Sequence, residues 1–115
     1  MRKVSIALLL FTAITLFQFC SSSKKTTAAS APVTTYDGNI KPLIEASCAP
    51  CHIAGKGNKK ALDNFANASA EADEMIERIQ KNPGDHGFMP MRNSKLPDSS
   101  IAIFVDWKKT GLKEK

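Results

Sequence analysis

Two cysteine thiols lie three positions apart at Cys48 and Cys51, and His52 directly follows the second of them. This spacing is typical of covalent haem attachment. Each thiol can add to one vinyl group at one edge of a porphyrin, and the adjacent imidazole then lies beneath the ring and can bind its iron. The motif therefore predicts that Cys48 and Cys51 tether one haem c per chain and that His52 is an axial ligand of the iron.

Two other uses of paired cysteines fit the sequence less well. A structural zinc site needs about four Cys or His ligands, and outside the motif the chain offers only Cys20 and His86. A thioredoxin-type redox pair follows a strand in a βαβ unit, but no alternating run of Val and Ile precedes Cys48. The sequence thus favours haem attachment over a zinc site or a thiol–disulfide centre.

A second candidate ligand lies in residues 84–91, which read Gly-Asp-His-Gly-Phe-Met-Pro-Met. A thioether sulfur suits haem iron and raises its reduction potential relative to a second histidine. Pro90 restricts the backbone of Met89 to an extended conformation, which helps a loop methionine keep a fixed reach. We expect Met89 to be the sixth ligand. Met91, His86 and an iron without a sixth protein ligand stay open as alternatives.

The first 19 residues have the pattern of a secretory signal peptide. A short basic start precedes an apolar run from Val4 to Phe19, which is near the lower limit of length for a membrane span. Cys20 then precedes small serines, which resembles a bacterial lipoprotein signal, although Phe19 replaces the usual small residue. Two outcomes stay open: Cys20 is lipidated, or it is removed with the signal. In both cases we predict an exported, periplasmic protein.

Composition divides the rest of the chain into a linker and one domain. Residues 20–35 are dominated by Ser, Thr, Ala and Lys and predict a flexible linker. Residues 36–115 form a domain of a size at which a protein-only core is marginal, and a buried porphyrin would enlarge that core. This domain has 12 basic and 11 acidic residues, a net charge of +1. Nucleic-acid binding, which needs a concentrated basic face, is not expected.

Three helices are predicted from the spacing of apolar residues. The first spans 37–49 and leads into the cysteine motif. The second spans 67–81 and has acidic residues at its start, where the helix dipole favours negative charge. The third runs from 97 or 98 to 110, with Gly111 in the C′ position. Residues 53–58, with two glycines, are expected to form a loop. The predicted fold class is therefore all-α.

Taken together, these motifs resemble a small monohaem class I cytochrome c. The matching segments are Ile40–His52, Met89–Pro90, Leu96 and the terminal helix up to Gly111, and they cover about residues 36–112. The resemblance implies a cytochrome c-like fold, with three main helices around a covalently bound haem. It also implies that the first and last helices cross near the haem and that His52 and Met89 bind the iron from opposite sides.

With both axial positions filled by protein side chains, the iron has no open position for a substrate. The resemblance thus implies a single-electron carrier, not an enzyme, that forms transient contacts with redox partner proteins. A haem-based sensor of small ligands or a peroxidase-like enzyme is the alternative, and it requires a labile sixth ligand. A structural lipoprotein without a cofactor is a third reading. Contact with a membrane is expected only through a lipid anchor at Cys20.

Overall fold

The computed structural model of the chain describes residues 32–115. The predicted signal peptide 1–19, Cys20 and most of the predicted linker lie outside the described residues. Between residues 32 and 115 the chain forms helices and loops but no strand, so the all-α prediction is confirmed. None of the helices in this part of the chain is long and apolar enough to cross a bilayer.

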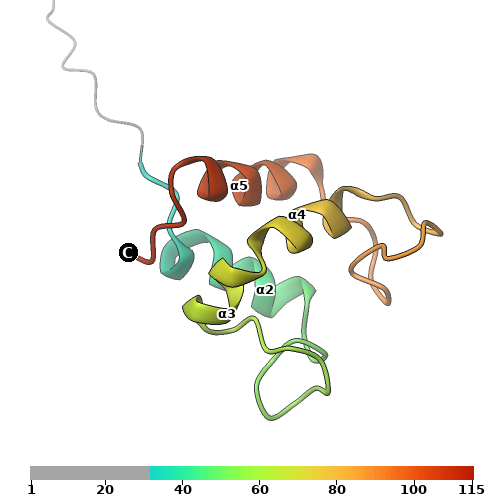
Figure 1. Cartoon of the computed structure of the whole chain (residues 1–115). Coiled ribbons are helices and arrows are strands. Elements are labelled where there is room, and N and C mark those ends of the chain that lie inside the picture. The colour runs from blue at the N-terminus through green and yellow to red at the C-terminus, as the bar shows by residue number, and fades with distance from the viewer. Residues whose placement is uncertain (1–31) are drawn as a thin grey trace, which may run out of the picture.

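The helical segments follow one another around a small core (Figure 1). In chain order they are the π-helical turn η2 (Tyr36–Ile40), α2 (Lys41–Ser47), α3 (Phe65–Ala70), α4 (Ala72–Gln80) and α5 (Asp98–Lys109). The last helix, α5, packs against both η2 and α4, and η2 runs directly into α2. The beginning and the end of the described chain therefore lie together.

The first helix forms close to its predicted position. The side chain of Thr35 accepts a hydrogen bond from the amide of Gly38 (3.2 Å) and caps the π-helical turn. Pro42 lies in the first turn of α2, a position where proline is tolerated. The helix ends at Ser47, two residues before the predicted end. Pro50 explains this end, because proline disfavours helical backbone at the residue before it.

The second predicted helix is wrong as a single element, because the chain forms α3 and α4 with a break at Glu71. There the backbone leaves helical geometry (φ −99°, ψ 7°), and the Glu71 carboxylate forms an ion pair with Lys60 of the preceding loop. The start also differs, since the side chain of Asn64 caps α3 by accepting from the amide of Asn67 (3.0 Å). The break is invisible to periodicity because buried Ala68 and Met75 continue one apolar face across it.

The third helix forms as predicted. α5 begins at Asp98 and ends at Lys109, and Gly111 follows with a φ of +95°, which suits the left-handed C′ position. Of its side chains, Ile101, Phe104 and Trp107 are buried. Three helices were thus predicted, and the structure divides the second of them into two.

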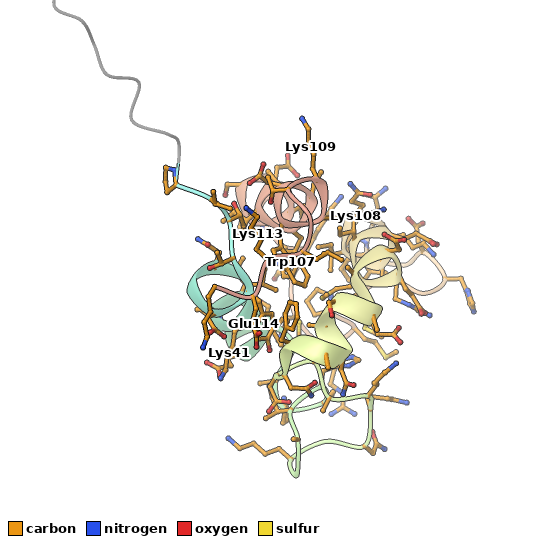
Figure 2. All side chains as sticks on the ribbon, turned by 60° about the vertical axis from the view of Figure 1, so that its left-hand side comes forward. Lys41, Trp107, Lys108, Lys109, Lys113 and Glu114 are labelled. Carbon is orange, nitrogen blue, oxygen red and sulfur yellow. The ribbon has the colours of Figure 1, made fainter. Side chains whose placement is uncertain are left out.

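Three aromatic rings fill the core where α5, η2 and α3 meet. The ring of Trp107 lies 6.0 Å from that of Tyr36 and 6.5 Å from that of Phe65, measured between ring centroids. The indole N–H of Trp107 donates to the carbonyl oxygen of Lys113 (2.8 Å), which also accepts from the amide of Tyr36 (2.8 Å). Figure 2 shows Trp107 inside the domain, with Lys113 and Glu114 of the tail beside the first helix. The C-terminal tail therefore fastens the first helix to the last.

Candidate functional site

The cysteine motif lies at the end of α2 as a series of turns. The amide of Cys48 still donates to Ile44 (2.8 Å), in continuation of the helix, and the amide of His52 donates to the carbonyl of Cys48 (3.1 Å). Cys48 and Cys51 are free thiols and both are partly exposed. The turn therefore presents two unbonded sulfur atoms and one imidazole from five consecutive residues.

The ring of His52 is oriented by the loop that follows it. Its Nδ1 lies 2.9 Å from the carbonyl oxygen of Lys60. Because a carbonyl oxygen can only accept a hydrogen bond, this contact puts the ring proton on Nδ1. Nε2 of the neutral ring then keeps its lone pair, which is the form of histidine that binds a metal.

Residues 53–62, here called the histidine loop, close back on the motif through backbone hydrogen bonds. The amide of Lys59 donates to the carbonyl of Cys51 (3.2 Å), and the amide of Leu62 donates to the carbonyl of His52 (2.8 Å). Within the loop, Gly57 approaches so closely that a Cβ at this position would lie 2.1 Å from the carbonyl oxygen of Cys51. Only glycine fits this approach, since a real Cβ does not come within 3.0 Å of another heavy atom.

Of the two cysteines of the motif, Cys48 is the one that packs against the apolar core. Its side chain packs against the core together with Leu43 and Ile53. Burial raises the pKa of the Cys48 thiol to about 11, so the group is a neutral thiol at physiological pH. A neutral thiol in contact with apolar side chains is a poor nucleophile. Such a setting suits a group that is to be held against an apolar ligand better than one that is to attack a substrate.

Residues 82–96, here called the methionine loop, contain the three candidates for a sixth ligand. Met89 is partly buried and packs against the core, between the buried side chains of Phe88 and Pro90. Met91 is 73% exposed, and His86 is exposed as well. Of the three side chains, that of Met89 is therefore the one that faces the interior.

In Figure 1 the methionine loop lies at the side of the domain away from the C-terminus, and the histidine loop lies below α2 and α3. One hydrogen bond joins the methionine loop to the motif: the side-chain amide of Asn93 donates to the carbonyl of Ser47 (3.0 Å), directly before Cys48. Cys48 and Met89 also pack against the same core cluster. Through Asn93, the methionine loop therefore lies beside the end of α2, directly before Cys48.

Two surface hollows accompany these elements. One, of about 390 Å³, lies between the end of α2 and residues 93–97, and the other, of about 610 Å³, lies between Gln80, Lys95 and α5. Neither hollow is lined by His52 or Met89. Within residues 32–115, no three His, Cys, Asp or Glu side chains gather closely enough to hold a metal ion between them. The candidate site is therefore defined by its donor atoms and not by a cavity.

Sequence reasoning missed three contributors to this end of the molecule. They are the identity of the backbone carbonyl expected to orient His52, which is that of Lys60, the close approach of Gly57, and the side chain of Arg78, which reaches the methionine loop (3.3 Å to the carbonyl of Gly87). A glycine-rich loop after the motif was a signal for the second of these. An arginine one helical turn after Glu74, near the end of a predicted helix, was a signal for the third. The first depends on backbone alone and leaves no trace in residue type.

Comparison of the chain with protein-family models, with curated proteins and with solved structures finds no match.

Proposed function

We propose that this protein is a single-electron carrier that holds one haem c covalently, in the manner of a small monohaem class I cytochrome c. Cys48 and Cys51 would form the two thioether bonds. His52 and Met89 would be the axial ligands. The protein would be exported and would pass electrons between transient redox partners outside the cytoplasm.

The described residues fit such a cofactor. Haem attachment needs two free thiols, which the motif offers, and iron ligation needs an imidazole, which His52 offers with its Nδ1 beside the carbonyl of Lys60. The pairing of a nitrogen and a thioether sulfur suits the iron of an electron carrier. The contact of α5 with η2 also agrees with the crossing of first and last helices that the resemblance implies.

The chain's own residues would orient the ligands and exclude water. The carbonyl of Lys60 would hold the proton of His52 on Nδ1 and leave Nε2 as the nitrogen that binds the iron. Leu43, Ile53 and Met89 pack against the core at this end and would shield one side of the site from solvent. When bound, the haem supplies the one-electron couple of its iron. A site with both axial positions filled by protein has no room for a substrate, which favours electron transfer over catalysis.

One observation carries the proposal: His52, next to two free thiols, has its Nδ1 bonded to a backbone carbonyl. A histidine that merely filled space on the surface would not require this tautomer. The same arrangement is the usual support for a histidine that binds a metal.

The test is the absorption spectrum of protein matured in a periplasm competent for haem attachment, in the oxidised and reduced states. We expect pigment that stays with the protein in acidic acetone, and a weak sulfur-to-iron band near the red end in the oxidised state. Met89→Ala should lose that band and lower the reduction potential markedly, whereas Met91→Ala should keep both. Colourless protein, or pigment released by acidic acetone, would contradict the proposal.

The alternative functions give different results in the same material. A sensor of small ligands would change its reduced spectrum when carbon monoxide is added, and a peroxidase-like enzyme would turn over peroxide. An electron carrier with Met89 bound should do neither at an appreciable rate. His86→Ala, which alters an exposed histidine, should leave all of these readings unchanged.

A further inference from the structure

Arg78 of α4 contacts the methionine loop through both its backbone and its side chain. Its carbonyl oxygen accepts a hydrogen bond from the amide of Met89 (3.2 Å). Its guanidinium donates from Nη1 to the carbonyl of Gly87 (3.3 Å). These two bonds fix both ends of the segment 87–89. A single residue of α4 therefore contacts both ends of this segment.

The guanidinium of Arg78 is itself held in place. Its Nε donates to Oε1 of Glu74 (2.8 Å), one helical turn earlier, and Nη2 bonds the same oxygen. A pair at this spacing on a helix limits the rotamers of both side chains. The planar guanidinium then keeps its Nη1 group in a fixed direction, which is toward the carbonyl of Gly87.

The methionine loop leaves space for the guanidinium of Arg78 at Gly87. Gly87 has a φ of +81°, which few other residues adopt, and a Cβ there would lie 3.0 Å from Nη1 of Arg78. Next to it, Nζ of Lys81 donates to the carbonyl of His86 (3.2 Å). Two cationic side chains, that of Arg78 in α4 and that of Lys81 directly after it, thus bind two successive carbonyl groups just before Met89.

We propose that Arg78 is a positioning residue for Met89: its guanidinium, oriented by Glu74, keeps the methionine loop closed and the Met89 sulfur presented to the haem iron. The inference rests on the function proposed above. Arg78 acts through the backbone of Gly87 and Met89 and does not itself bind the cofactor. Its loss should therefore change how firmly the sulfur is held, while the attachment of haem to Cys48 and Cys51 is unaffected.

The measurable consequence is competition for the sixth position. An external ligand such as imidazole can bind the iron only while the sulfur is displaced, so its apparent affinity reports how often the loop opens. Loss of a hydrogen bond from a charged donor should raise the apparent affinity roughly tenfold. The amide of Met89 should also exchange its hydrogen faster, because its bond to Arg78 breaks whenever the loop opens.

The experiment uses oxidised holoprotein of the wild type, Arg78→Met, Arg78→Lys and Arg92→Met, each titrated with imidazole while the sulfur-to-iron band is followed. Arg78→Met should bind imidazole roughly tenfold more tightly than the wild type. Arg78→Lys, which keeps a charged donor, should fall between them. Arg92→Met removes the same charge from an exposed position in the methionine loop and should match the wild type. Hydrogen exchange of the Met89 amide, measured by NMR, should follow the same order.

Equal shifts in Arg78→Met and Arg92→Met would overturn the inference, because loss of charge alone would then explain them. If Arg78→Met does not yield folded holoprotein, Glu74→Gln is the deciding variant. It leaves the guanidinium of Arg78 in the protein but removes the carboxylate that orients it. It should move the imidazole titration the same way by a smaller factor, and an unchanged titration would overturn the inference. Failure of the proposed function is seen separately: the wild type would then lack the band, and Met89→Ala would leave the spectrum unchanged.

Discussion

The histidine loop, which follows His52, and the methionine loop, which contains Met89, are held to the domain in different ways. The histidine loop closes on the backbone of the motif, because its amides donate to the carbonyls of Cys51 and His52. The methionine loop is held largely by the ends of side chains, those of Arg78, Lys81 and Asn93. The histidine loop is thus held mainly by backbone bonds to the motif, whereas the methionine loop is held by the backbone bond between Met89 and Arg78 and by these three side chains.

This difference predicts which ligand can leave. Bonds between neighbouring backbone groups break only when the loop itself unfolds, whereas a side chain of an exposed residue can let go of a carbonyl by changing its rotamer. Under the proposed function, His52 would stay bound through both oxidation states, and Met89 would be the ligand that is released under stress. Four substitutions test this contrast.

The largest effect is expected from Gly57→Ala in the histidine loop. The new Cβ would lie 2.1 Å from the carbonyl oxygen of Cys51, and its nearest neighbours are all backbone atoms of Pro50 and Cys51, which cannot turn aside as a side chain can. We expect a loss of at least about 3 kcal/mol in the free energy of unfolding, with a low yield of pigmented protein. Chemical denaturation measures the loss. Gly55→Ala is the control, because a Cβ at Gly55 meets nothing within 4 Å and only backbone strain of about 1 kcal/mol remains.

Tyr36→Phe should have the next largest effect. The buried hydroxyl of Tyr36 donates to the carbonyl of Leu62 at the end of the histidine loop (2.9 Å). Removing it leaves that carbonyl without this partner and should cost about 1 to 3 kcal/mol of unfolding free energy. A denaturation midpoint equal to that of the wild type would show that this bond does not support the loop.

The ionisation of Tyr36 should also lower the stability of the domain at high pH. Burial, and then the carboxylates of Asp63 and Asp37, raise the pKa of Tyr36 from 10.0 to about 12. Below the pKa of Tyr36 in the unfolded chain, both the folded and the unfolded protein keep the phenol proton, so the contribution of Tyr36 to stability is complete there. That contribution is lost as the pH rises through the pKa of the folded protein, because the unfolded chain releases the proton at a lower pH. Tyr36 is the only tyrosine of the chain, so the absorbance of tyrosinate reports the ionisation of this residue alone. In Tyr36→Phe, the loss of stability at high pH should be smaller than in the wild type.

Gly87→Ala in the methionine loop should cost less than Gly57→Ala. Its φ of +81° strains any residue with a Cβ, but the atoms that crowd the new group are the side-chain ends of Arg78 and Lys81, which can move. We expect about 1 to 2 kcal/mol of destabilisation, with haem attachment intact and the sulfur-to-iron band weakened. A loss of pigment comparable to that of Gly57→Ala would contradict the contrast between the loops.

The smallest effect is expected from Asn93→Ala, which removes the exposed bond to the carbonyl of Ser47. Because both partners can turn to water, the unfolding free energy should fall by only about 0.5 kcal/mol. The band should nevertheless be lost at a lower imidazole concentration than in the wild type. Ser94→Ala, at the neighbouring position, serves as the control. An imidazole titration identical to that of the wild type would show that Asn93 does not help to hold the methionine loop.

Helix positions were predictable where local signals agree. The helix before Cys48 and the helix that ends before Gly111 form close to their predicted bounds, because apolar spacing, Pro42 and a C′ glycine all act within a few residues. The break at Glu71 was not predictable, because the apolar face continues across it and its carboxylate pairs with Lys60, a residue of another segment. Local patterns carry no information about such a partner.

The sequence by itself determined the donor chemistry at the candidate site: two thiols and an imidazole must lie together because they are consecutive along one turn of the chain. Only the tertiary structure decided that Met89 packs inward while Met91 is exposed, and that Lys60 supplies the carbonyl for His52. Both methionines have the same chemistry and nearly the same position. Their burial depends on where α4 and the core hold the loop, and that is fixed by contacts between residues far apart in the chain.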